Sequence, residues 1–203
     1  MLYIGIVLVT SALGILIYKN INTIGHDLII VTIALLGTVC FWYSFKNTKG
    51  YSREKVMSVT IWFDYILLLG CLLLLTFIGY LQFEYHVLGN HWGLSTFIPM
   101  VLLFAAAYYF DHLGVLSLAI VNLATWVGIT VTPMQMLAGN DFGSEKLIYS
   151  GLVLGGLLIA VAVASSIKNI KAHFYFTYMN FGCHILLVSL LAAMFHFENT
   201  YIL

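Results

Sequence analysis

The stretch TIWFDYILLLGCLLLL, residues 60–75, decides the class of this protein, because it places one carboxylate, that of Asp64, inside an almost wholly apolar run. Such runs recur along the chain. Of its 203 residues, 62% are hydrophobic and 8% are charged, whereas about 25% of the residues of an ordinary soluble domain are charged. A helix needs roughly 17–25 apolar residues to cross a bilayer. The sequence therefore predicts an all-α integral membrane protein, a polytopic bundle of transmembrane helices.

Polar clusters divide the chain into about seven predicted spans, which cover residues 2–18, 28–45, 56–81, 92–110, 113–133, 147–167 and 174–195. The connections are short and no change of composition marks a linker. Neighbouring helices are therefore expected to pack as antiparallel hairpins in a single domain, residues 1–203. No Lys or Arg precedes the first apolar run and no A-x-A cleavage site follows it, so we expect a retained span rather than a signal peptide.

The distribution of Lys and Arg predicts the orientation. If the N-terminus is cytoplasmic, six basic residues lie inside, namely Lys46, Lys49, Arg53, Lys55, Lys168 and Lys171, and only Lys19 and Lys146 lie outside. Short cytoplasmic loops carry such an excess of basic residues, which predicts an N-in/C-out topology. The basic loop could also bind anionic lipid headgroups, although setting the topology is the favoured role.

Small residues mark the predicted span 147–167 as an interior helix. Gly151 and Gly155 form a G-x-x-x-G step, and Gly156, Ala160 and Ala164 repeat small side chains every four residues. Such positions let a neighbouring backbone approach closely. Packing within this chain is favoured over dimerisation, because six other helices need a partner. Pro99 and Pro133 are expected to kink or end their helices.

Counting from the predicted cytoplasmic ends places polar side chains of four helices at one depth. At about 1.5 Å per residue, Asp64 lies about eight residues or ~12 Å deep, and Asn122 and His184 lie ~13–15 Å deep. Thr10 and Ser11 reach a similar depth. Two helices carry polar stripes on one face, formed by His173, Thr177, Asn180 and His184 and by Thr60, Asp64 and Cys71.

An ionised Asp at a helix centre costs ~2.5–3.5 kcal/mol, so Asp64 is expected to face the bundle interior, either protonated or paired. His184 and Asn180 are its first candidate partners, and Asn122 is the next. The favoured interpretation is a set of interhelical hydrogen bonds worth ~0.6–2 kcal/mol each. The alternative is a proton, ion or small-ligand site, because ionisable groups inside a membrane are functional candidates. A wrong span assignment, or a partner subunit that pairs with Asp64, is the third interpretation.

Histidines and carboxylates gather at the predicted outer surface. The candidate metal ligands are His26, His86, His91 and His196, with Asp27, Glu84 and Glu198 nearby. Their spacing matches no metal motif, so interfacial histidines without a metal are favoured. Only His184 lies clearly at mid-membrane depth, and bis-histidine haem ligation is therefore not expected. We predict no cofactor.

Sequence signatures of soluble enzymes and of nucleic-acid binders are missing. The chain has no G-x-S-x-G, H-E-x-x-H, P-loop or dinucleotide fingerprint, and its net charge of zero argues against nucleic-acid binding. Asp111 and His112 abut at a predicted tight turn, where Asp111 is expected to cap the next helix rather than form a catalytic dyad. Cys40, Cys71 and Cys183 lie inside apolar runs, so no disulfide is expected.

Two stretches carry a resemblance to a known family. They are LYIGIVLVTSALGILIYKNINTIGHDLII, residues 2–30, and residues 73–126, where Gln82, Tyr85, Trp92 and Pro99 are the marker positions. Both resemble the predicted bacterial membrane proteins catalogued as domain of unknown function two-one-five-seven. The resemblance implies a multi-pass protein of the bacterial inner (cytoplasmic) membrane, and it carries over no catalytic residues.

The sequence thus predicts a membrane protein without enzymatic chemistry, an accessory, scaffold or assembly subunit that acts through helix and lipid contacts. Its expected partners are the lipid bilayer and other membrane subunits. The alternative is a small transporter, channel or proton path through the polar layer of Asp64, Asn122, Asn180 and His184. An intramembrane enzyme is a third and weaker class. No inverted repeat is visible, which disfavours a standard secondary transporter.

Overall fold

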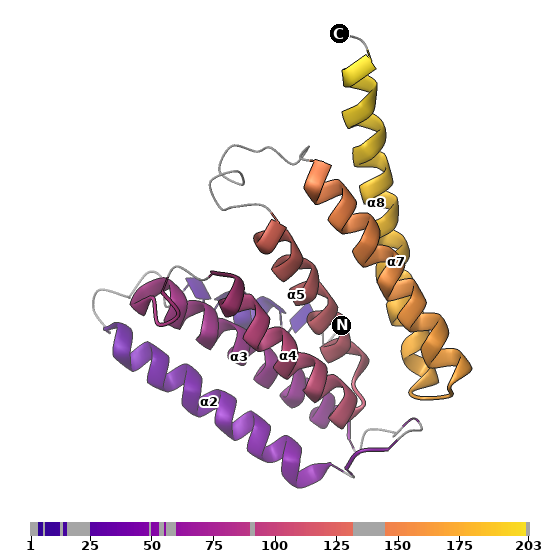
Figure 1. Ribbon diagram of the computed structural model, residues 1–203. Helices are drawn as coiled ribbons and strands as arrows, with labels where there is room; N and C mark the ends of the chain where they lie inside the picture. Colours follow the sequence, from indigo (N-terminus) through magenta and orange to yellow (C-terminus); the bar gives the residue numbers. More distant parts are fainter. Residues whose placement is uncertain are drawn as a thin grey trace. The chain divides into compact units, whose positions relative to one another are not determined.

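The computed structural model describes residues 4–5, 7–12, 14–15, 25–48, 50–52, 55, 60–89, 92–131 and 145–201, with backbone only at 92 and 197–201. The described residues contain helices and turns but no β-strand. In chain order the elements are α2 (His26–Asn47), α3 (Ile61–Tyr85), α4 (Trp92–Phe110), α5 (Leu113–Val131), α7 (Glu145–Ile167), the short 3-10 helix η1 (Ala172–Phe174) and α8 (Tyr175–Tyr201). Figure 1 labels the α-helices.

Six helices of the described chain are long and apolar enough to cross a membrane, which confirms the predicted polytopic helical fold. The seventh predicted span, residues 2–18, is described only in part, and its described residues 4–5, 7–12 and 14–15 are helical. Pro133 lies outside the described residues. The exact number of spans and the N-in/C-out orientation therefore stay predictions.

Packing divides the chain into two compact units. The first unit comprises Met1–Gly50 and Met57–His91, and the second comprises Tyr51–Val56 and Trp92–Leu203. Each unit is described by itself below. The single domain expected from the sequence stays a prediction about how the two units assemble.

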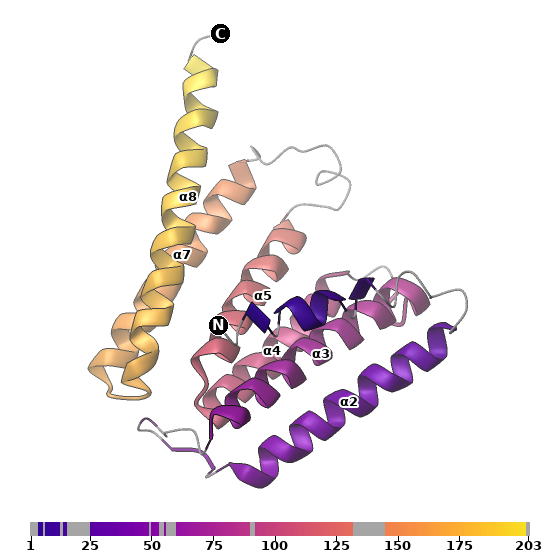
Figure 2. The same cartoon turned by 180° about the vertical axis from the view of Figure 1, so that it is seen from behind.

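In the first unit, α2 and α3 lie side by side as an antiparallel pair (Figure 2). Ile29 and Ile33 of α2 are buried against Leu73 of α3, with Phe77 and Tyr80 packed around them. Gly70 brings the two helices together, because a Cβ atom at this position would lie 3.0 Å from the Cβ of Cys40. The pair thus buries one face of each helix and leaves other apolar side chains exposed, as a bilayer allows.

The turn after α3 is held by Gln82, whose side chain is almost fully buried. Its Nε2 donates to the carbonyl oxygen of Gly89 at 2.7 Å, and its Oε1 accepts from the N–H of Leu88 at 3.0 Å. One side-chain amide therefore forms hydrogen bonds with two backbone groups, the Leu88 N–H and the Gly89 carbonyl, which lie beyond the helix end and have no intrahelical partner. This is a structural reason for a glutamine at that marker position.

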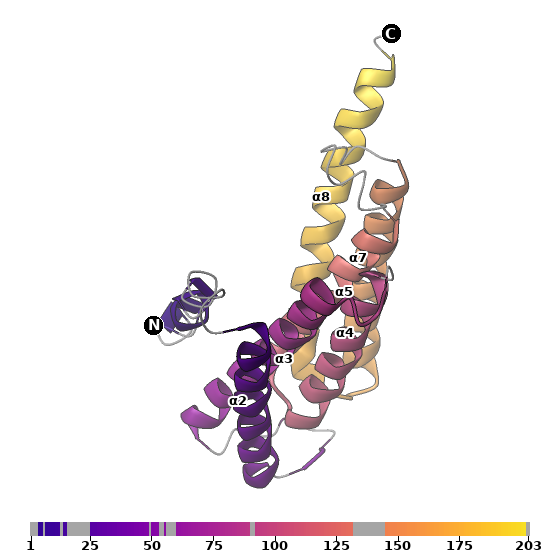
Figure 3. The same cartoon turned by 90° about the vertical axis from the view of Figure 1, so that its left-hand side faces the viewer.

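The second unit contains two helical hairpins, α4–α5 and α7–α8, and the α7–α8 pair is visible in Figure 3. A Cβ atom at Gly155 would lie 2.9 Å from the backbone nitrogen of Leu186 and 3.0 Å from the carbonyl oxygen of Gly182. The predicted close approach at the G-x-x-x-G step is therefore present, and its partner is α8. Gly156, Ala160 and Ala164 are all exposed within the second unit, so the accompanying prediction of a close helix contact is not met by the helices of this unit.

Candidate functional site

Helices α4 and α5 are joined by only two residues, Asp111 and His112. Asp111 adopts a left-handed conformation with φ of 59°, which Asp and Asn tolerate better than most residues. The N–H of Val115 donates to Nδ1 of His112 at 3.1 Å, so His112 caps α5. The prediction that Asp111 caps this helix is wrong, because the left-handed turn directs its carboxylate toward the turn between α7 and α8.

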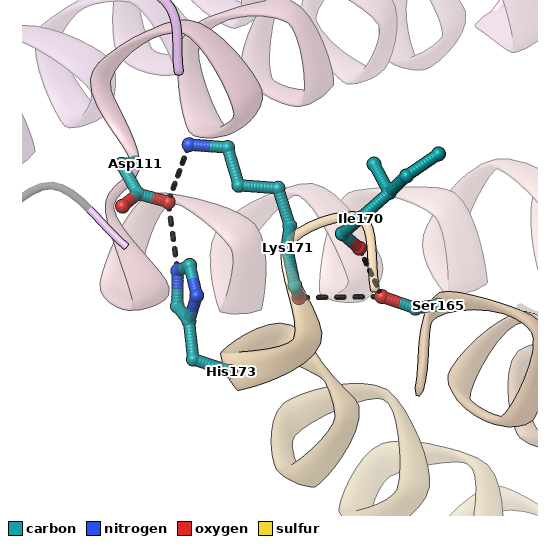
Figure 4. A network of polar contacts seen from close by, with 5 residues as sticks. All are labelled: Asp111, Ser165, Ile170, Lys171 and His173. Carbon is teal, nitrogen blue, oxygen red and sulfur yellow. Dashed lines mark hydrogen bonds and ion pairs between the residues drawn. The ribbon is translucent and has the colours of Figure 1, made fainter. Parts of the chain in front are cut away.

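The turn between α7 and α8 also contains left-handed residues, with φ of 50° at Asn169 and 51° at Lys171. Its backbone is held by the hydroxyl of Ser165, which donates to the carbonyl oxygen of Ile170 at 2.6 Å and lies 3.2 Å from that of Lys171 (Figure 4). The hydrogen bonds of Ser165, in the last turn of α7, thus stabilise the backbone of the turn from which the Lys171 side chain extends.

These two turns bring together Asp111, Lys171 and His173, which we call the Asp111 cluster (Figure 4). One carboxylate oxygen, Oδ1, lies 2.7 Å from Nζ of Lys171 and 2.7 Å from Nε2 of His173. The side chains of Lys171 and Asp111 are 0% and 1% exposed, and that of His173 is 17% exposed. A buried charge is stable only when it is paired. The α4–α5 turn supplies the carboxylate, and the α7–α8 turn supplies the ammonium and the imidazole that pair with it.

Aromatic rings surround the Lys171 ammonium. Its Nζ lies 5.5 Å from the ring centroid of Tyr51 and 5.9 Å from that of Phe174, within the range of cation–π attraction. Phe174 meets Tyr108 edge to face, and the hydroxyls of Tyr108 and Tyr178 are 3.0 Å apart. The cluster therefore joins both hairpins to the segment that contains Tyr51 and places two aromatic rings near the cation.

The Asp111 cluster was not predicted from the sequence. One signal was present, since Asp111, Lys171 and His173 all fall at the predicted cytoplasmic ends of their helices. The spacing of sixty residues between the Asp and the Lys, however, has no local periodicity. Only the packing of the two hairpins pairs them.

Asp64, the centre of the predicted polar layer, lies in the first turn of α3. Thr60 is extended, with φ of −151°, so the helix begins at Ile61 rather than at the predicted residue 56. The predicted depth of about eight residues for Asp64 is therefore wrong. A carboxylate in the first turn is favoured by the partial positive charge of a helix N-terminus, which gives a local reason for an Asp at this position.

Asn122 of α5 bridges to α4. Its Nδ2 donates to the carbonyl oxygen of Thr96 at 2.9 Å. Pro99, inside α4, has no N–H to donate to the carbonyl one turn earlier, that of Ser95. The Asn122 amide binds the adjacent carbonyl, that of Thr96, and so ties the proline-containing helix α4 to α5.

Asn180 and His184 are exposed on α8. His184 Nδ1 lies 2.7 Å from the carbonyl oxygen of Asn180, one turn earlier in the same helix. The second unit therefore brings Asn122 to α4 and leaves Asn180 and His184 on another surface. Asp64 belongs to the first unit, so its predicted pairing with these three residues stays a prediction.

The predicted outer histidines fall into separate places. His26 Nδ1 lies 2.7 Å from the Tyr80 hydroxyl and 3.5 Å from Oε2 of Glu84, and the Tyr85 hydroxyl donates to Oδ1 of Asp27. His86 ends α3 in a left-handed conformation, and His196 Nε2 lies 3.9 Å from Oε1 of Glu145. His91 and the side chain of Glu198 lie outside the described residues. Among the residues that the structure describes, no three His, Cys, Asp or Glu side chains form a metal-binding group.

Replacing Asn122 with leucine is expected to destabilise the protein by roughly 0.6–1.7 kcal/mol, the range of interhelical hydrogen bonds in membranes. The measurement is unfolding by SDS in dodecylmaltoside micelles, followed by helical circular dichroism. Pro99→Ala restores an N–H whose helical acceptor is the Ser95 carbonyl and not that of Thr96, so the same Asn122→Leu change is expected to cost as much in that background. A cost that disappears in the Pro99→Ala background would show that the Asn122 hydrogen bond matters only beside the proline.

The comparisons with known proteins agree with this architecture. The family model described as "Predicted membrane protein (DUF2157)" matches residues 1–116, more than half of the 203 residues. No curated protein and no solved structure matches the chain. The matched residues include all of α2, α3 and α4, and the marker residues Gln82 and Pro99 lie among them. The chain therefore belongs to the DUF2157 family of predicted membrane proteins.

Proposed function

We propose that this protein is an accessory, scaffold or assembly subunit of the bacterial inner (cytoplasmic) membrane that acts through helix and lipid contacts and without catalysis. The observation that carries the proposal is the exposed face of α8. Asn180, Cys183 and His184 are all exposed within the membrane-span candidate Ala172–His196. Ionisable and polar side chains inside a membrane almost always face protein or a water-filled cavity. We therefore infer that a helix of another protein covers this face in the membrane.

The geometry of His184 supports the same conclusion. A backbone carbonyl only accepts hydrogen bonds, so the 2.7 Å contact means that Nδ1–H donates to the oxygen of Asn180. In the neutral ring, Nε2 is then an acceptor on an exposed side chain. A donor from a neighbouring helix would satisfy it, as interhelical hydrogen bonds do elsewhere in membranes.

Two observations weigh against the rival function, a transporter or proton path. Asp64 lies in the first turn of its helix rather than at mid-span, and the Asn122 amide is engaged by a backbone carbonyl. Ion pathways instead need ionisable groups along a hydrated route. The scaffold remains the simpler account of these side chains.

The proposed contact is tested with a photoreactive benzoylphenylalanine at Leu187, which is 58% exposed and one turn beyond His184. In native membranes we expect a cross-linked product that contains a peptide of another membrane protein. His184→Leu is expected to reduce its yield several-fold, whereas His184→Gln, which keeps an acceptor, should retain it. Adducts with lipid alone, or with the chain's own first unit alone, would contradict a scaffold that works through this face.

Transport is tested in proteoliposomes that contain a pH-sensitive dye. We expect proton flux no faster than in protein-free vesicles after a pH step, because the polar side chains form local hydrogen bonds. Asp64→Asn and His184→Leu should then change nothing. A protein-dependent flux that both substitutions abolish would replace the scaffold with the transporter.

A further inference from the structure

The second unit contains an apolar cavity of about 590 Å³ that opens along one side of α7. Tyr149, Val153 and Leu157 line it and recur every four residues, so they follow one face of the helix. Their exposed fractions of 54%, 65% and 58% show that this wall is open to the surroundings. From Tyr149 to Val161, another lining residue, the cavity follows α7 for roughly 18 Å. This is close to one leaflet, half of the ~30 Å hydrocarbon core.

One end of the cavity is suited to a polar headgroup. Lys146 lies in the first turn of α7, and Lys146, Tyr149, Ser150 and Val153 have the spacing i, i+3, i+4 and i+7 of one helix face. Lys146 is exposed, and Tyr149 and Ser150, one turn further along the helix, line the cavity together with Trp126. Amphipathic aromatic side chains of this kind favour the headgroup level of a membrane.

The neighbouring acidic residue lies close to another helix. Glu145 also lies at the start of α7, but its Oε1 lies 3.9 Å from Nε2 of His196 on α8. Consecutive helix residues point in different directions. The start of α7 thus carries an exposed ammonium, that of Lys146, one turn before the lining residues Tyr149 and Ser150, while the cavity itself is apolar.

We propose that this groove binds one glycerophospholipid, with the lipid phosphate against Lys146 and one acyl chain along α7. The charge complementarity of ammonium and phosphate commits the site to this occupant rather than to a second copy of the chain or another helix. The proposal deepens the lipid-contact part of the proposed function. It involves α5 and the other face of α7, not the α8 face around His184, so either idea can fail alone.

The experiment uses the full chain in dodecylmaltoside with palmitoyl-oleoyl-phosphatidylglycerol as the probe, and native mass spectrometry as the readout. We expect one lipid bound per chain. Lys146→Ala, which removes the ammonium, and Val153→Trp, which fills the open wall, should each weaken binding at least five-fold, while Lys146→Arg should bind normally. The matched controls are Lys168→Ala, at the other end of α7, and Val163→Trp, which is 41% exposed and outside the cavity lining. Neither should change the affinity.

A second measurement needs no groove-filling variant. Phosphatidylglycerol brominated on its acyl chain is expected to quench the fluorescence of the wild-type chain more than that of Trp126→Phe, because Trp126 lines the cavity. Lipid retained equally by Val153→Trp and wild type, or quenching equal with and without Trp126, would overturn the proposal. A dimer that Val153→Trp dissociates would also overturn it and assign the groove to a second copy.

Discussion

Asp111→Asn is expected to lower the free energy of unfolding by about 3–5 kcal/mol, the cost of leaving one partner of a buried ion pair unpaired. The substitution keeps the shape of the side chain and tolerates the left-handed backbone at this position, so the change isolates the charge. The ammonium of Lys171, 2.7 Å from the carboxylate and 0% exposed, would then be a buried cation without a counter-charge. SDS-induced unfolding in dodecylmaltoside micelles, followed by circular dichroism, measures the loss.

A second substitution shows whether the charge is the cause. In Asp111→Asn/Lys171→Met the buried cation is gone, so the stability should return to within ~1 kcal/mol of wild type, as replacing both charges of a buried pair often allows. Lys171→Met alone is expected to cost less than Asp111→Asn, because His173 still lies 2.7 Å from the carboxylate. A double variant as unstable as Asp111→Asn would mean that the ion pair is not what holds the two turns together.

Gly155→Ala is expected to destabilise the protein by roughly 1–3 kcal/mol relative to Gly156→Ala. The added Cβ at position 155 would lie 2.9 Å from the backbone nitrogen of Leu186 and 3.0 Å from the carbonyl oxygen of Gly182. These are backbone atoms, so α7 and α8 must separate to admit the methyl group, and the dispersion contacts along the pair weaken. The same unfolding experiment measures the difference.

Gly156→Ala is the matched control, since a Cβ atom at the adjacent position meets nothing within 4 Å. Both substitutions gain the same helix propensity, about 0.8–1 kcal/mol in favour of alanine, so the comparison removes that gain. Equal stabilities of the two variants would mean that the close approach of α7 and α8 is not under steric control. The Gly155 and Gly156 variants measure how much the α7–α8 helix contact contributes to the free energy of unfolding. The Asp111 variants measure the contribution of the ion pair between the two turns.

The amino-acid sequence by itself determined the class of the protein and most of its helices. A bilayer can be crossed only by long apolar helices or closed barrels. The hydropathy of a span depends only on neighbouring residues in the sequence, so such helices can be predicted without the tertiary structure. The predicted span 92–110 coincides with α4, Trp92–Phe110, and the predicted span 28–45 lies inside α2, His26–Asn47. The close approach at Gly155 was also predicted, because a G-x-x-x-G step lets a neighbouring backbone approach.

The tertiary structure alone decided which polar groups meet. Asp64 was predicted near mid-span but lies at a helix end, because Thr60 is extended and α3 begins only at Ile61. The predicted depth of Asp64 was counted from residue 56, so the later start of the helix makes that depth too large. Gly155 and Gly156 are adjacent residues of the same type, yet only Gly155 lies against α8. Asp111 meets Lys171 because two left-handed turns, far apart in the chain, direct a carboxylate and an ammonium into the same buried volume. Such pairing depends on how hairpins pack, and no local pattern in the sequence encodes it.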